Sequence, residues 1–103
     1  MTFFDFLKKI DINEGVRLCS ETEGAVLLDV READEYNNRH IPNAVNLPLS
    51  MIRTAEKTIP DKNTPLFVYC LSGARSGQAV AFLRRKGYSN ARNIGGIQEW
   101  KKD

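Results

Sequence analysis

A cysteine stands where an apolar segment gives way to a small polar loop, and it is the residue of this chain best suited to covalent chemistry. The apolar and aromatic run Leu66 to Tyr69 ends at Cys70, and an amphipathic segment, Gln78 to Lys86, follows the loop. A thiol attacks as its thiolate, which is scarce at neutral pH unless the surroundings stabilise the anion. The order of these segments predicts a strand, a loop and a helix, with Cys70 at the end of the strand.

The loop after Cys70 is suited to holding an anion. Residues 72–74 are Ser, Gly and Ala, which are small enough to let backbone N–H groups turn inward. The helix expected to begin near Arg75 or Ser76 directs its unpaired N–H groups to the same point, and Arg75 adds a positive charge. We therefore predict that the pKa of Cys70 lies below the ordinary thiol value of about 8.5. The alternative is that Cys70 is a buried small hydrophobic residue at a strand end.

A second apolar run leads to charged residues that we expect at the same edge of the fold. Residues 25–30 are apolar apart from Asp29, which is typical of a strand covered on both faces in a parallel sheet. Ligand sites of open α/β sheets lie outside the carboxyl ends of the strands. Asp29, Arg31 and Cys70 are therefore expected at one edge, where Asp29 and Arg31 would support the site.

Other chemically capable side chains favour structural interpretations. His40 precedes Ile-Pro and could act as a general base, but such a histidine is more often a turn residue hydrogen-bonded to the backbone. Glu32, Asp34 and Glu35 could line the rim of a site, although runs of charge usually mark a solvated face. Cys19 lies in an expected helix and indicates core packing.

The composition is that of one ordinary globular domain. The 103 residues are 42% hydrophobic and 27% charged, which suits one core, so we expect a single domain over residues 1–103. The net charge of +2 is small and the basic residues are scattered, so nucleic-acid binding is not indicated. Cys19 and Cys70 form no CxxC pair and there is one histidine, so neither a zinc site nor a disulfide framework is predicted.

The first ten residues carry apolar side chains interrupted by charges. No small-residue cleavage site follows, so we expect neither a signal peptide nor a membrane span. A working thiol must stay reduced, which favours a cytoplasmic location. The apolar spacing over residues 2–10 fits a short amphipathic helix packed on the domain, or a frayed terminus. Phe3, Phe4 and Phe6 would cover the core or form an adhesive patch, and we expect a monomer with no membrane partner.

Apolar strand patterns alternate with helical patterns along the rest of the chain. Strands are expected over residues 25–30, 44–48 and 66–70 and within 88–94. Helices are expected over residues 15–22, 33–37, 50–56, about 75–86 and 97–102, the last anchored by Trp100. This alternation implies right-handed crossovers and an α/β fold. We predict three α/β/α layers around a mostly parallel sheet of about five strands.

Four short motifs follow one another in a specific order. They are Leu28-Asp29-Val30-Arg31 with Glu35-Tyr36, His40-Ile41-Pro42-Asn43-Ala44-Val45-Asn46-Leu47-Pro48, Cys70-Leu71-Ser72-Gly73-Ala74-Arg75-Ser76, and Asn93-Ile94-Gly95-Gly96-Ile97 with Trp100. Together they resemble a single-domain rhodanese from about residue 24 to the end of the chain. Arg39 and Asn43 stand where that family usually has glycine. Asparagine tolerates left-handed backbone angles, whereas Arg39 needs an ordinary conformation or some local strain.

The resemblance implies sulfur transfer. Cys70 would attack the sulfane sulfur of thiosulfate or of a persulfide and hold it as a cysteine persulfide, and cyanide or a thiol, small or on a protein, would then collect it. The residues whose N–H groups would stabilise the persulfide are Leu71, Ser72, Gly73, Ala74, Arg75 and Ser76. Arg75 would orient the anionic donor or, as we favour, brace the loop against an acidic partner such as Asp29. No metal or organic cofactor is required.

Two other functions are compatible with a cysteine and an arginine in such a loop. Phosphatases and arsenate reductases of a related fold use the spacing C-x5-R, whereas four residues separate Cys70 from Arg75, and Ser76 takes the position of their arginine. The shorter loop should cup a single sulfur atom and exclude phosphate oxygens. A non-catalytic rhodanese module is the other alternative, although modules of that kind commonly lack the cysteine.

Overall fold

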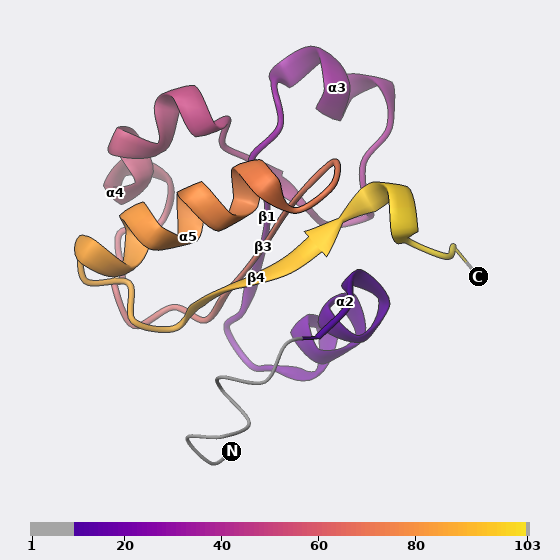
Figure 1. The fold of residues 1–103 in the computed structure, drawn as a ribbon. Helices are drawn as coiled ribbons and strands as arrows, with labels where there is room; N and C mark the ends of the chain where they lie inside the picture. The colour runs from indigo at the N-terminus through magenta and orange to yellow at the C-terminus, as the bar shows by residue number, and fades with distance from the viewer. Residues whose placement is uncertain (1–9, 103) are drawn as a thin grey trace.

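The central strand of the sheet is buried along its whole length, as its apolar residues predict. The structure, a computed structural model, describes residues 10–102. Within this range four strands run parallel in the order β2-β1-β3-β4 (Figure 1). They are β1 (Val26–Asp29), β2 (Val45–Asn46), β3 (Leu66–Cys70) and β4 (Ala91–Gly96). The parallel α/β fold is confirmed, with one strand fewer in this range than the five predicted.

Helices lie on both faces of the sheet (Figure 1). The elements on one face are η1 (Leu49–Thr54), α4 (Ala55–Thr58) and α5 (Ala74–Arg85), and those on the other are α2 (Ile12–Glu21) and η2 (Ile97–Glu99). The short helix α3 (Ala33–Asn38) lies beyond the carboxyl ends of the strands. None of the helices in residues 10–102 has the length and apolar character needed to cross a bilayer.

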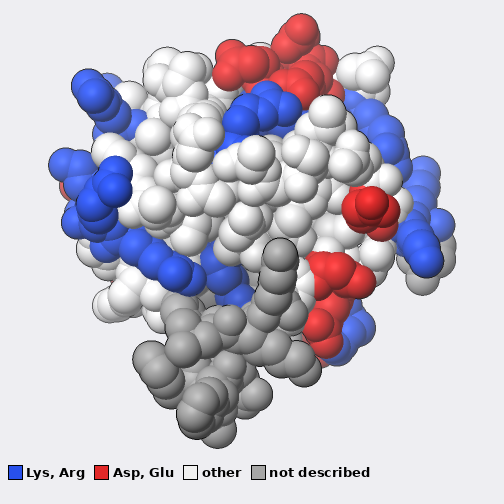
Figure 2. All heavy atoms as spheres, in the orientation of Figure 1, with Lys and Arg blue, Asp and Glu red and all other residues white. Residues whose placement is uncertain are grey.

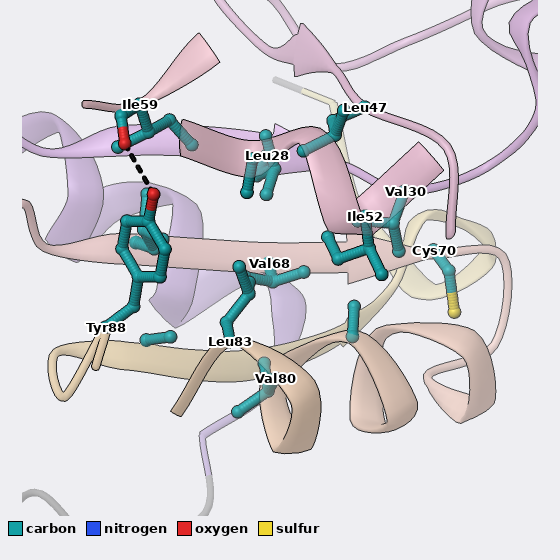
Figure 3. Close-up of a cluster of buried hydrophobic side chains, with 14 residues drawn as sticks. Leu28, Val30, Leu47, Ile52, Ile59, Val68, Cys70, Val80, Leu83 and Tyr88 are labelled. Carbon is teal, nitrogen blue, oxygen red and sulfur yellow. Dashed lines mark hydrogen bonds between the residues drawn. The ribbon is translucent and has the colours of Figure 1, made fainter. Parts of the chain in front are cut away.

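Alternation of side chains along β3 divides the core into two clusters. Leu66, Val68 and Cys70 belong to the cluster on the α5 face, part of which Figure 3 shows. Phe67 and Tyr69 belong to the cluster on the α2 face. Successive residues of a strand point to opposite sides of a sheet, so Cys70 and Tyr69 face different layers.

The ends of the helices differ from several predicted boundaries. Helix α2 begins at Ile12, earlier than predicted, because Asp11 caps it by accepting a hydrogen bond from the Glu14 N–H at 2.9 Å. The prediction of a helix over residues 97–102 is wrong, since only a single 3-10 turn forms and Trp100 continues in an extended conformation. The helical segment predicted for residues 2–10 lies outside the described residues, apart from Ile10.

Both residues that replace family glycines adopt the conformations expected of them. Asn43 has a φ of 73°, in the left-handed region. Arg39 has a φ of −167° and a ψ of 135°, which is ordinary extended backbone. The left-handed angle at Asn43 fits the expectation that asparagine tolerates this region. Of the two alternatives for Arg39, the structure shows the ordinary conformation.

Candidate active site

The sulfur of Cys70 is surrounded by hydrogen-bond donors from the turn that joins β3 to α5. The Gly73 N–H donates to Sγ at 3.0 Å and the Ser76 N–H at 3.3 Å. The Ser76 hydroxyl oxygen lies 3.3 Å from the same sulfur. Figure 3 shows the sulfur at the end of β3, beside the first turn of α5. The inward-turned amides that the small loop residues predict are therefore present.

These contacts determine how readily Cys70 ionises. Cys70 is 1% exposed, and burial acts to raise the pKa of its thiol. Hydrogen bonds from the Ser76 hydroxyl and from the N–H groups of Ser76, Gly73 and Ser72 outweigh this burial and lower the pKa below the ordinary value. This direction agrees with the sequence-based prediction, and the sulfur lies deeper than a strand end suggests.

Two glycines allow the loop to close tightly over the sulfur. Gly73 is the N-cap of α5 and has a φ of 106°, a conformation that L side chains rarely adopt. Gly96 pairs with Cys70 in the sheet, and the backbone of the loop passes directly over it. A Cβ atom at position 96 would overlap the Leu71 carbonyl and the Ser72 Cα. Leu71 itself turns outward and is 44% exposed.

We expect Gly96→Ala to damage both the loop and its chemistry. The added methyl group meets backbone that has no flexible end to move, so the loop shifts away from the sulfur. We expect a loss of about 2–4 kcal/mol in the free energy of unfolding and a Cys70 pKa that rises toward its ordinary value. Chemical denaturation and a pH titration of the thiol measure these effects. Gly77→Ala is the matched control, because its Cβ would meet only Asn93 Nδ2, at 3.4 Å. Equal behaviour of the two proteins would contradict this account.

Arg75 is held by a carboxylate of α3. Its guanidinium donates to Glu35 Oε1 at 2.7 Å and to Oε2 at 3.0 Å. The Arg75 hydrogen bond holds the pKa of Glu35 at about 2, and the same pair raises the pKa of Arg75. Figure 2 shows acidic side chains gathered over α3 with basic ones beside them. Arg75 thus braces the start of α5, but its partner is Glu35 and not the expected Asp29. Glu35 is therefore partly exposed but paired with Arg75, as the rim interpretation allows.

The Glu35 pair should stabilise the fold in a pH-dependent way. A depressed carboxyl pKa adds stability above the ordinary value, and this stability disappears as pH falls from about 4.5 to about 2. Both side chains are about a third exposed, so Glu35→Gln should cost about 0.5–1.5 kcal/mol near neutral pH and little near pH 2. Urea denaturation at the two pH values measures this. The exposed Arg17–Glu21 pair offers a control, Glu21→Gln, for which we expect almost no change. If Glu35→Gln lowered the free energy of unfolding as much near pH 2 as near neutral pH, the stabilising role assigned to the Glu35–Arg75 pair would be refuted.

Asp29 and Arg31 lie at the expected edge but on the other side of the sheet. Asp29 is in register with Tyr69, and Arg31 lies over the Tyr69 ring, with the guanidinium carbon 5.8 Å from its centroid. Arg31 donates to Asp29 Oδ2 at 2.7 Å and to the Arg39 carbonyl at 2.7 Å. The pair is buried. Cys70 points to the opposite face, so the carboxyl edge brings the three residues near one another without giving them a common site.

Asn93 is a site residue that the sequence did not single out. Its Oδ1 accepts the Ser76 hydroxyl at 2.7 Å and the Gly95 N–H at 2.9 Å, and its Nδ2 donates to the Gly73 carbonyl at 3.0 Å. It therefore connects β4 to Gly73 and Ser76, two of the residues that donate to Cys70. Its place beside Gly95-Gly96 in the last motif was the available signal.

His40 and Cys19 have structural surroundings. His40 Nδ1 lies 2.8 Å from the Tyr36 carbonyl, and the two rings stack with centroids 3.8 Å apart. Cys19 packs against the core cluster on the α2 face, and burial raises the pKa of its thiol to about 11. It also lines a surface hollow of about 620 Å³ together with Pro42 and Trp100, and no residue of the 70–76 loop lines that hollow. Both structural interpretations are confirmed.

Comparison with known proteins identifies the family to which this chain belongs. The rhodanese-like domain family matches residues 14–103. The chain belongs to the rhodanese-like family. The match includes the strand, loop and helix around Cys70, together with the β4 motif that closes the loop.

Similar proteins of this family are named as sulfurtransferases. The rhodanese-like chain is 38% identical over 73 residues to the thiosulfate sulfurtransferase PspE of Escherichia coli, covering 70% of each chain. It is 37% identical over 95 residues to a sulfurtransferase of Allochromatium vinosum, covering 91% of this chain and 88% of that one. The solved human single-domain sulfurtransferase TSTD1 is 29% identical, with a TM-score of 0.77 over 87% of this chain and 94% of that one. These relationships identify a rhodanese-type sulfurtransferase.

Proposed function

We propose that this rhodanese-like chain transfers a sulfane sulfur from thiosulfate or a persulfide to a thiophilic acceptor through a persulfide on Cys70. The observation that best supports this proposal is that two backbone N–H groups and a hydroxyl converge on the buried sulfur of Cys70. Donors of this kind favour an anion at that point over a neutral thiol. The names of the relatives support thiosulfate as a donor.

The reaction consists of two displacements at sulfur. In the first, the Cys70 thiolate attacks the outer sulfur of thiosulfate, a new S–S bond forms, and sulfite leaves with the electron pair of the old one. In the second, cyanide or a thiolate attacks the outer sulfur of the persulfide, and the Cys70 thiolate leaves. Thiocyanate or a new persulfide is the product. Electrons balance at each step without an added oxidant or reductant.

The loop would stabilise the persulfide between the two steps. The outer sulfur of a deprotonated persulfide carries the negative charge and would lie among the N–H groups of residues 71–76. Arg75 supports this arrangement indirectly, because both arms of its guanidinium are bound to Glu35. That engagement also disfavours the phosphatase alternative, which requires an arginine free to grip phosphate oxygens.

Burial of the sulfur sets a condition on the mechanism. Because Cys70 is 1% exposed, a donor has little access to Sγ in this conformation of the loop. The exposed Leu71 side chain, next to the nucleophile, is the part of the loop that an incoming thiol or protein acceptor would meet first. The same burial is the observation that favours a non-catalytic binding module as the second candidate function.

Mass spectrometry and turnover distinguish the two candidates. After treatment with thiosulfate or glutathione persulfide, the enzyme should gain the mass of one sulfur atom, and cyanide or a thiol should remove it. Comparing turnover with the two donors identifies the preferred one. Failure to gain sulfur from thiosulfate, from persulfides and from polysulfide would favour the binding module.

A further inference from the structure

The hydroxyl of Ser76 has one proton and more than one acceptor within reach. Asn93 Oδ1 lies 2.7 Å from the Ser76 oxygen and Cys70 Sγ lies 3.3 Å from it. A third group, the Gly95 carbonyl, is at 3.5 Å. Ser76 is fully buried, so water does not compete for this proton. The hydroxyl can therefore donate either to Asn93 or to the sulfur, and not to both.

The orientation of the Asn93 amide is determined by its other partners. The Gly95 N–H can only donate, so it requires an oxygen opposite it, and the Gly73 carbonyl can only accept, so it requires the amide NH₂. Oδ1 is consequently the atom that faces Ser76.

The chemical state of the sulfur determines the direction of the Ser76 hydroxyl. When Cys70 is a thiol, its S–H can donate to the Ser76 oxygen while Ser76 donates to Asn93, a chain that satisfies every group. When Cys70 is a thiolate, the hydroxyl must turn to the sulfur. In a persulfide the inner sulfur is uncharged and accepts weakly, so the hydroxyl turns back to Asn93.

We propose that Asn93 is a positioning residue whose side-chain oxygen competes with Cys70 Sγ for the single hydroxyl proton of Ser76. The inference rests on the proposed role of Cys70 as nucleophile. Asn93 favours the resting thiol and the loaded persulfide over the free thiolate, so the free thiolate is less stable than it would be without this competing acceptor.

Charged groups near Cys70 also act on its sulfur. Their charges stay the same when the Ser76 hydroxyl turns between Asn93 and the sulfur. Arg75 of α5 interacts with Cys70 through space, and its charge is offset by Glu35 of α3 and, more weakly, by Glu32, the N-cap residue of α3. The Asp29–Arg31 pair of β1 faces the other layer of the sheet. Substitutions at Asn93 can leave all of these charges in place.

Two substitutions of similar shape separate the proposal from a purely structural role. Asn93→Leu removes the acceptor, and Asn93→Asp retains it and strengthens it. Both lose the hydrogen bond to the Gly73 carbonyl, so a residue that only held the loop would give changes in the same direction. We expect Leu to raise the thiolate-to-thiol ratio of Cys70 about threefold at fixed pH and Asp to lower it. If the Asn93→Leu protein does not fold, Asn93→Ala takes its place in this test.

The measurement is the ultraviolet absorbance of the thiolate as a function of pH, which needs no reagent to enter the buried site. All variants carry Cys19→Ala, and the Cys70→Ser protein is subtracted as background. Asn90→Ala, which removes a hydrogen bond to the Asn63 carbonyl at the other end of β4, is the control and should leave the titration unchanged.

A double-substitution cycle tests the route through Ser76. In a Ser76→Ala background the effect of Asn93→Leu should vanish, and that of Asn93→Asp should shrink to its through-space charge. An effect of Leu that persists there, or Leu and Asp changes in the same direction, would overturn the proposal. The titration involves no sulfur transfer, so its result stands whether or not Cys70 forms a persulfide.

Discussion

Cys70→Ser abolishes sulfur transfer, with turnover falling by about a thousandfold or more. Serine retains the size of cysteine, but its hydroxyl does not ionise near neutral pH and cannot form a persulfide. The fold should survive, because the loop still supplies the Gly73 and Ser76 N–H groups to an oxygen at this position. Turnover with thiosulfate and cyanide measures the loss, and intact mass shows whether the sulfur adduct disappears.

Cys19→Ala is the matched control for this substitution. Cys19 is the other free cysteine of the part of the chain that the structure describes, and its raised pKa leaves it a neutral thiol. The control protein should gain and release sulfur as the wild type does. An adduct that survives in Cys70→Ser and disappears in Cys19→Ala would exclude Cys70 as the carrier and with it the proposed mechanism.

Removing Asp29 should cause a large loss of stability with little direct effect on the sulfur. Asp29→Ala leaves the Arg31 guanidinium buried with one carbonyl partner, and an uncompensated buried charge of this kind costs about 3–5 kcal/mol. That is a large share of the stability of a small domain. Urea denaturation measures the loss, and the titration of Cys70 in the folded protein should stay close to that of the wild type.

Replacing both members of the pair distinguishes a structural role from a chemical one. Asp29→Leu combined with Arg31→Met removes both charges, and we expect it to recover part of the lost stability. Sulfur transfer should then return with the fold. A stable double variant that binds donor but has lost transfer would instead assign Asp29 or Arg31 a part in the reaction.

The segment around Cys70 could be predicted because its signals are local. A buried apolar run, three small residues and an amphipathic segment specify β3, the turn and α5 within twenty consecutive residues. The left-handed conformation of Asn43 is likewise a property of one residue and its backbone. The prediction of a helix over residues 97–102 failed, because six residues give little periodicity. The packing of Trp100 against the core decides the conformation of this segment instead.

Contacts between distant parts of the chain could not be predicted in this way. Glu35 and Arg75 are 40 positions apart, and Ser76 and Asn93 are 17 apart. Their meeting depends on the strand order and on the one-residue irregularity between β3 and β4 near Val68. A shift of one residue in register would turn a side chain to the other face of the sheet.

The sequence by itself determined the parallel α/β fold and the presence of a cysteine at the end of a buried strand, before a turn of small residues. These properties follow from local patterns of polarity and size. Only the tertiary structure decided that Glu35 holds Arg75, that Asp29 and Arg31 face away from the sulfur, and that Asn93 reaches Ser76. Each of these depends on which strands are neighbours and in what register, and strand neighbours are chosen by the packing of the whole core.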